Sequence, residues 1–196
     1  MYSFTTPVAR CATPCKNPLP QTATSCCTGA EGGGDKLGLY GAIIDEAVSV
    51  IQDMNEEIAR QGRGLSPAER LRYFVGTFLT RVARLEGRAL LLSQLIRHEI
   101  SEPSPLSRRL LDQGLAPRLR YLSEIVAELL ERPMGDEAVR FCTLSVHAQC
   151  ITFMRDALRT VAFRRWQPAT PEELARAVEH VTAFSLAGIA ALRARR

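Results

Sequence analysis

Helix-start signals recur along most of this chain and divide it into long segments that each have one apolar side. Residues 66–69, Ser-Pro-Ala-Glu, combine an N-cap, a proline at the first helical position and the glutamate of a capping box. Asp136 and residues 170–173, Thr-Pro-Glu-Glu, start further segments in a similar way. Apolar residues between these signals recur at steps of three and four, and no segment alternates like a β-strand. The sequence therefore predicts an all-α fold.

The pattern predicts helices over residues 39–60, 66–85, 89–100, 104–130, 136–161 and 170–193. Residues 104–105, Ser-Pro, are expected to open the fourth of these ranges as residues 66–67 open the second. Pro117 lacks an amide hydrogen and clashes with the carbonyl four residues earlier, so this helix is expected to kink or split near residues 112–114.

Residues 1–33 differ in character from the rest. They contain prolines and glycines but no apolar period, which predicts an irregular, disordered segment before a helical domain over residues 34–196. Four cysteines lie in this segment, at Cys11, Cys15, Cys26 and Cys27. Their spacing matches zinc sites poorly, and a reducing compartment argues against disulfides, so neither is expected.

Composition restricts the class of protein only mildly. The chain has 196 residues and a formal net charge of +4, which is compatible with nucleic-acid contact but does not indicate it. Lysine occurs only at Lys16 and Lys36, and this preference for arginine has two interpretations: a GC-rich, bacterial-type genome, or binding of phosphates or carboxylates. The sequence contains no run of about 18 apolar residues and no signal-peptide pattern at its start, so we expect a cytoplasmic protein without a membrane partner.

Catalytic and metal-binding patterns are not found. The histidines, His98, His147 and His180, fall in no hydrolase, zinc-protease or P-loop motif. His147 and Cys150 share one helical face, but a histidine in such a position more often belongs to the core. We therefore expect no enzyme activity, no catalytic residues, no cofactor and no metal.

Three segments resemble a known family of regulators. Gly34-Asp35-Lys36-Leu37-Gly38-Leu39-Tyr40, followed by Ala42-Ile43, resembles the exit from a TetR-type helix-turn-helix. Residues 91–105, Leu-Leu-x-x-Leu-Ile-Arg-His-Glu-Ile-Ser-Glu-Pro-Ser-Pro, resemble the TetR subgroup with a CerR-like C-terminal domain, and residues 181–189 are similar to its last helix. The resemblance covers the chain from Gly34 to its end and implies ligand-controlled repression of transcription.

The DNA-binding residues of that family have no counterpart before Gly34. Its helix-turn-helix would lie there, but residues 1–33 contain no matching recognition helix and only Arg10 and Lys16 as basic residues. The family implies operator DNA as a partner; for this chain we expect an absent or scrambled DNA-binding head and identify no DNA-binding residue.

The resemblance also implies a homodimer, in which the last two helices pair with those of a second subunit. Small and apolar residues of the last helix fit this role, and the alternative is a helix buried in the core of its own subunit. The expected interface residues are Val178, Val181, Phe184, Ala187, Gly188 and Ala191.

A pocket for a small-molecule effector is expected where three helices converge, with ordinary core packing as the alternative. Its candidate residues combine an apolar wall with a few polar groups: Tyr73, Phe74, Thr77, Phe78, Arg97, His98, Glu99, Thr143, His147, Cys150 and Phe153. The sequence as a whole indicates a ligand-sensing, dimerising core; the alternative is a stand-alone helical module that binds a small molecule or a protein and has no role in transcription.

Overall fold

The computed structural model of the protein describes residues 36–83, 87–153, 168 and 170–195, and its regular structure in those ranges is entirely helical. The all-α prediction is thus confirmed for this part of the chain. The elements, in order, are α1 Lys36–Gln61, α2 Pro67–Ala83, α3 Gly87–Ser101, α4 Ser107–Leu110, the π-helical turn η1 Leu111–Leu115, α5 Ala116–Leu130, α6 Glu137–Thr152 and α8 Pro171–Arg193. The predicted irregular segment 1–33 and its cysteines lie outside the described residues.

Three of the predicted helix starts, at Ser66, Asp136 and Thr170, are confirmed by their hydrogen bonds. The Ser66 amide donates to the Glu69 carboxylate at 2.8 Å, and the Glu69 amide donates to the Ser66 hydroxyl at 3.4 Å, which is a reciprocal capping box. Asp136 accepts from the amide of residue 138 at 2.7 Å, and the Thr170 hydroxyl accepts from the amide of residue 173 at 3.2 Å. Helix α6, however, ends at Thr152 with Phe153 as its C-cap, and residues 154–161 of the predicted range lie outside the described residues.

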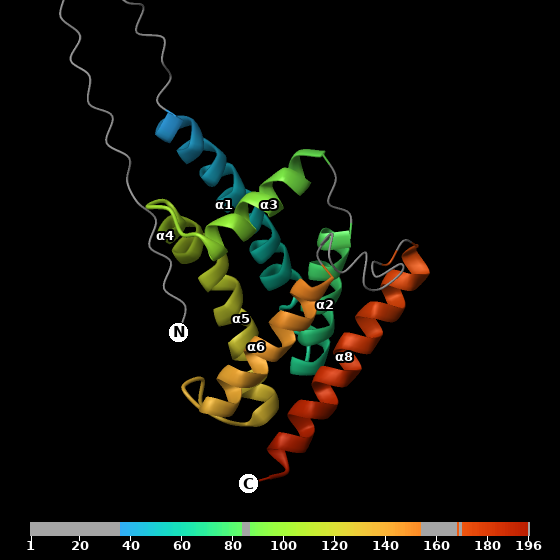
Figure 1. Ribbon diagram of the computed structural model, residues 1–196. Helices are drawn as coiled ribbons and strands as arrows, with labels where there is room; N and C mark the ends of the chain where they lie inside the picture. Colours follow the sequence, from blue (N-terminus) through green and yellow to red (C-terminus); the bar gives the residue numbers. More distant parts are fainter. Residues whose placement is uncertain (1–35, 84–86, 154–167, 169, 196) are drawn as a thin grey trace, which may run out of the picture. The chain divides into compact units, whose positions relative to one another are not determined.

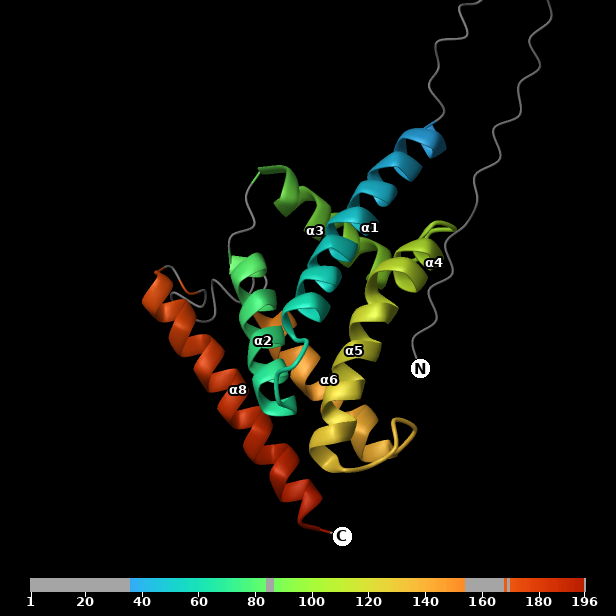
Figure 2. The same cartoon turned by 180° about the vertical axis from the view of Figure 1, so that it is seen from behind.

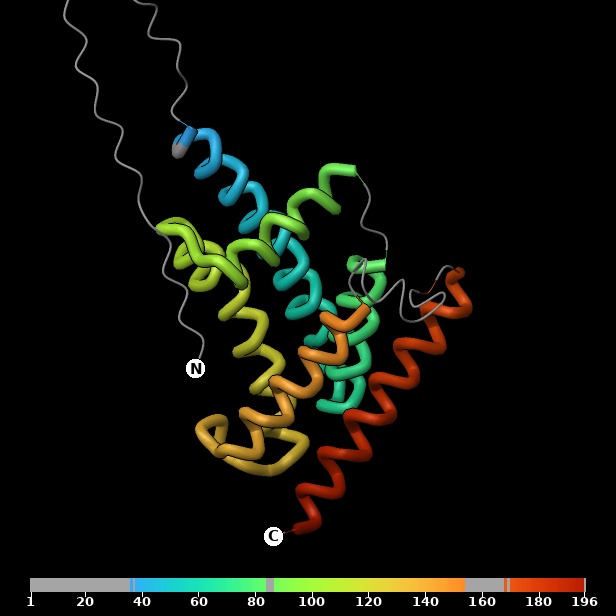
Figure 3. The backbone as a smooth tube through the Cα atoms, viewed as in Figure 1, coloured from blue at the N-terminus to red at the C-terminus, as the bar shows by residue number. Residues whose placement is uncertain are grey.

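Pro117 distorts its helix as expected, but through a π turn rather than a break. The turn η1 directly precedes α5, so the chain continues from α4 through η1 into α5 (Figure 3). Pro117 cannot donate to the carbonyl of Gln113, and Gln52 of α1 donates to that carbonyl instead at 3.4 Å. Asn55 of α1 donates to the neighbouring Gly114 carbonyl at 2.9 Å. Side chains of α1 therefore satisfy the backbone groups that the proline disturbs.

The fourth helix begins later than expected, at Ser107 rather than at Ser104. The Ser107 amide donates to the Ser104 carbonyl at 3.1 Å, so residues 104–107 form a turn. The Ser104 hydroxyl accepts from the Leu106 amide at 3.2 Å and donates to the Glu99 carboxylate at 2.6 Å. The Ser-Pro pattern predicted a helix start here, but a hydrogen bond from Ser104 to Glu99, five residues earlier, takes part in the turn instead.

Glu99 is a buried carboxylate that joins α1 to the α3–α4 connection. Its side chain is only 2% exposed and also accepts a hydrogen bond from the Tyr40 hydroxyl near the start of α1. Burial raises the pKa of Glu99, but the hydrogen bonds from Ser104 and Tyr40 outweigh it and hold that pKa below its usual value. The hydrogen bond to Glu99 also raises the pKa of Tyr40 to about 12. Glu99 is therefore ionised and Tyr40 is neutral at pH 7.

The apolar core consists of two clusters. The larger lies where α2, α5, α6 and α8 meet, and Phe74, Leu79 and Leu122 are among its least exposed side chains. The smaller lies among α1, α3, α4 and η1 and includes Ile44 and Leu110. Helix α2 packs against α8, α5 and α1, as the two opposite views show (Figures 1 and 2). This arrangement leaves α1 and α3 over one end of the α2–α5–α6 group, where they line a cavity together with it.

Candidate functional site

A cavity of about 540 Å³, which we call the central cavity, lies among α1, α2, α3, η1, α5 and α6. Its wall is mainly aliphatic, with Ile51 and Met54 from α1, Leu92 and Ile96 from α3, and Ile151 from α6. Its volume falls within the range of roughly 300–1,000 Å³ that is usual for small-molecule sites. Helices far apart in sequence thus supply one shared apolar wall.

A polar cluster interrupts this wall where α2, α5 and α6 meet. The guanidinium of Arg118 on α5 lies over the Phe78 ring of α2, with its central carbon 5.1 Å from the ring centroid. His147 of α6 meets the same ring edge-on, at 6.0 Å between centroids. All three residues line the central cavity.

Burial decides the ionisation of this cluster. It lowers the pKa of Arg118 to about 10, so the guanidinium stays charged at pH 7. Burial and the charge of Arg118 together lower the pKa of His147 to about 4, which leaves the imidazole neutral. Burial also raises the pKa of the Cys150 thiol to about 12, so Cys150 is not a thiolate nucleophile at neutral pH. The cluster therefore carries one positive charge.

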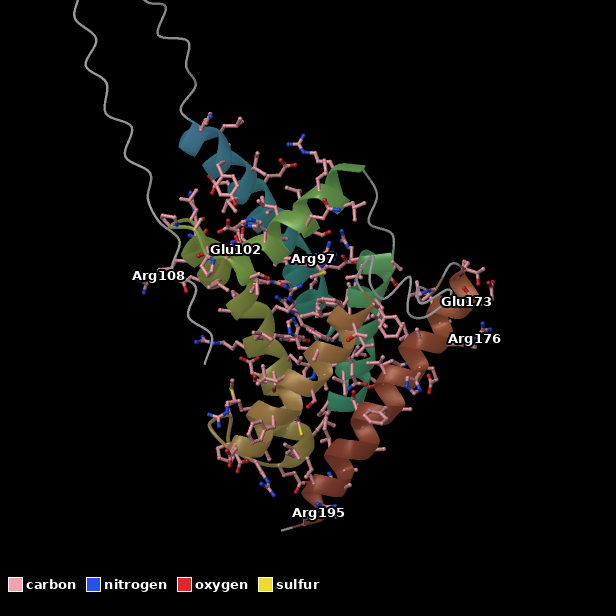
Figure 4. All side chains as sticks on the ribbon, in the orientation of Figure 1. Arg97, Glu102, Arg108, Glu173, Arg176 and Arg195 are labelled. Atoms are coloured by element: carbon pink, nitrogen blue, oxygen red, sulfur yellow. The ribbon has the colours of Figure 1, made fainter. Side chains whose placement is uncertain are left out.

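The predicted pocket residues separate into different places. Phe78, Arg97 and His147 line the central cavity. Figure 4 labels Arg97 toward the middle of the bundle, whereas Glu102 lies at the α3–α4 end. Tyr73 and Thr77 instead line an outer groove of about 580 Å³ near α8. They diverge from Phe78 because residues one and five positions apart on a helix do not share a face.

The remaining candidates lie outside the central cavity. Glu99 is bonded to Tyr40 and Ser104, and His98 is exposed and lies 3.8 Å from Glu102. The others belong to the core or pack against it: Phe74, Thr143, Cys150 and Phe153. Thr143 donates to the Val139 carbonyl at 2.8 Å. The expected set therefore mixes cavity wall with core.

The outer groove contains more charged residues than the central cavity, but these are paired. Arg81 binds Glu57 at 2.5 Å, and Arg72 binds Glu179 of α8. Glu69 is held by the Ser66 capping box. These pairs account for the charged rim of the groove, so we favour the central cavity as the ligand site.

Sequence reasoning missed the contributions of α1 and of Arg118. An apolar helical face is expected to pack into the core, and the spacing of the α1 residues does not distinguish a core position from a position in a cavity wall. Arg118 did carry a signal: it lies four residues before Leu122 and seven before Ile125, on the buried side of α5. A charge at a core position requires a partner, and this could have marked the residue.

Helices α6 and α8 have apolar side chains on their outer faces. The Gln149 side chain of α6 lies 3.3 Å from the Ser185 hydroxyl of α8, so the two helices lie side by side (Figure 1). On α6, Phe141 is 55% exposed and Leu144 is 50% exposed. On α8, Phe184 is 64% exposed.

The expected interface residues divide between the two sides of α8. Phe184, Ala187, Gly188 and Ala191 are exposed. Val181 is buried in the core of the chain, and Val178 is half-buried near Gly76 of α2. Helix α8 thus packs against the other helices by one side, and its other side, which carries small residues, is exposed in this chain.

The described ranges show neither a metal site nor a membrane-spanning helix. No group of three or more His, Cys, Asp or Glu side chains there could hold a metal ion. None of the helices in those ranges is both long enough and apolar enough to span a membrane.

Comparison with known proteins identifies the family. No curated protein matches the chain. Residues 67–189, from the start of α2 into α8, match the family model described as the C-terminal domain of the HTH-type transcriptional dual regulator CecR. The match bears out the predicted type of C-terminal domain and corrects the family's name from CerR to CecR. The chain therefore belongs to the CecR C-terminal domain family of transcriptional regulators.

Proposed function

We propose that this chain is the effector-sensing and dimerising body of a cytoplasmic, TetR-type transcriptional regulator. The observation that carries the proposal is that α1 forms one wall of the central cavity. In the family resemblance, α1 is the helix that follows the DNA-binding head. A molecule in the cavity would therefore touch the element that leads toward DNA.

The contacts of α1 suggest how occupancy could be transmitted. Ile96 and Arg97 of α3 line the cavity, and Glu99 of the same helix holds Tyr40 of α1. A ligand that binds one arrangement of α1 and α3 more tightly than another shifts the population toward that arrangement. The position of the α1 start would then depend on whether the cavity is filled.

The second part of the proposal is a homodimer through α6 and α8. The exposed apolar side chains on these neighbouring helices form a surface that a second copy can cover by pairing the same two helices. Small residues at positions 187, 188 and 191 permit close approach of two α8 helices. The result would be a four-helix bundle.

A cavity-filling variant tests the effector site. N-phenyl-1-naphthylamine, a neutral apolar dye that fluoresces in apolar cavities, is expected to bind the wild-type chain with micromolar affinity. Ala89→Trp, which places an indole in the central cavity, should weaken dye binding about tenfold or more because the ring occupies the same volume. Fluorescence titration measures both affinities.

Leu91→Trp provides the matched control, since Leu91 is on the same helix but is 64% exposed. It should bind the dye as the wild type does. Absence of dye binding to the wild type, or equal loss in both variants, would contradict an effector site in the central cavity.

We expect a polypeptide of this sequence not to bind operator DNA specifically. Specific readout requires a helix in the major groove, and residues 1–33 carry no pattern for one. A mobility-shift titration on the upstream region of its own gene, at two salt concentrations, should give only weak binding that falls steeply with salt. Nanomolar binding that resists competitor DNA would overturn this expectation and assign operator binding to the chain itself.

A further inference from the structure

The central cavity contains the positive charge of Arg118, for which the described residues supply no negative partner. Arg118 is 7% exposed, and its buried Nε atom has no hydrogen-bond partner. No carboxylate among the described residues lies within ion-pair distance of its guanidinium. By contrast, Arg81 at the cavity rim is paired with Glu57. Arg118 is therefore a buried guanidinium of the cavity wall that finds no anion among the described residues.

The surrounding groups do not supply this anion. His147 is neutral at pH 7, and the Cys150 thiol remains protonated because burial raises its pKa to about 12. The Phe78 ring faces the guanidinium and offsets part of its desolvation. It leaves the in-plane N–H donors unused, because the ring contacts the guanidinium through its face. A buried guanidinium with free donors is costly unless an acceptor satisfies them.

The rest of the cavity defines the body of the missing partner. Apart from the polar cluster, its wall is mainly aliphatic, with Ile51, Met54, Leu92 and Ile96 as examples, and Thr80, Ser93, Arg81 and Arg97 are its other polar residues. Such a wall favours an apolar skeleton. A carboxylate matches the planar fork of a guanidinium through two parallel hydrogen bonds.

We propose that the effector of the central cavity is an apolar molecule with a single carboxylate, and that the Arg118 guanidinium binds this carboxylate. This inference rests on the proposed function, because it gives the chemical class of the molecule that the same cavity senses. Arg118 thus binds the effector and also gives it a higher affinity than a neutral molecule of the same shape.

Competition between an acid and its matched alcohol tests the inference. Decanoate and decan-1-ol have the same chain length, and each is titrated against bound N-phenyl-1-naphthylamine on the full-length chain. Water solvates the carboxylate better than the alcohol, so an apolar cavity alone would prefer decanol. Arg118 reverses this preference: decanoate should compete at lower concentration than decanol in the wild type.

Arg118→Met removes the charge and keeps an apolar side chain of similar length. Decanoate affinity should fall on the order of 10- to 100-fold, as expected for loss of hydrogen bonds to a charged group, whereas decanol should bind unchanged or more tightly. Arg118→Gln gives a second way to remove the charge if the methionine variant fails to fold. Arg120→Met is the matched control, since Arg120 is exposed on the same helix, and it should leave both affinities unchanged.

The outcomes separate the two proposals. If the dye does not bind the wild-type chain, the proposed effector site is wrong and this inference falls with it. If the dye binds but decanoate competes no better than decanol, or its affinity does not depend on Arg118, the effector site stands and the carboxylate assignment is wrong.

Discussion

Gly188→Glu is expected to sediment as a monomer at micromolar concentrations at which the wild-type chain sediments as a dimer. A Cβ atom at position 188 would meet nothing within 4 Å in its own subunit, so the variant should fold. In a symmetric dimer the substitution places two carboxylates in an apolar helix–helix contact, where they are desolvated and repel each other. Sedimentation velocity measures the change, and circular dichroism verifies that the helices are retained.

Two variants control for effects on α8 itself. Gly188→Ala removes the backbone flexibility of glycine without adding charge and should remain dimeric. Ala175→Glu adds the same carboxylate to an exposed position elsewhere on α8 and should also remain dimeric. A wild-type chain that sediments as a monomer would falsify the proposed dimer. Dimers of Gly188→Glu as tight as those of the wild type would exclude this face as the interface.

Phe74→Ala is expected to lower the free energy of unfolding by about 3–5 kcal/mol. Phe74 has no exposed surface, and its ring stacks with that of Phe78 at 6.3 Å between centroids. Truncation to alanine leaves a cavity in the larger core cluster and removes this aromatic contact. Since small domains are stable by only about 5–15 kcal/mol, the variant should approach the limit of stable folding. Chemical denaturation followed by circular dichroism measures the loss.

Tyr73→Ala serves as the neighbouring comparison, because Tyr73 is half-buried at the outer groove rather than enclosed. Its truncation should cost roughly 1 kcal/mol, in the range of ordinary partly exposed positions. Equal losses for the two variants would mean that α2 does not present Phe74 to the core in the way described.

The helix boundaries could be predicted because their causes are local. Ser66 and Glu69 cap the same helix end from three residues apart, and Thr170 caps α8 in a similar way. The distortion before Pro117 was predictable for the same reason, since a proline acts on the carbonyl four residues earlier. The prediction for Ser104 was wrong because its hydroxyl also binds Glu99, a contact that the Ser-Pro pattern does not encode.

The candidate site could be predicted only in part. Phe78, Arg97 and His147 line the central cavity as expected, but Tyr73 and Thr77 face another side of α2. An amphipathic pattern identifies which side of a helix is apolar; it does not tell whether that side meets another helix or an open space. The contribution of α1 to the cavity wall was hidden for this reason.

The amino-acid order was enough to establish the helical class, the capped helix starts and the type of regulator domain, since these depend on residues close together in the chain and on motif order. The central cavity depends instead on how far α1 and α3 stand from α2, α5 and α6, which is set by the packing of side chains from distant segments. The same packing surrounds Arg118 with Phe78 and His147. The position of Arg118 on the apolar side of its helix indicates that its charge is buried. Only the packing of the helices shows that no carboxylate among the described residues lies close enough to pair with it.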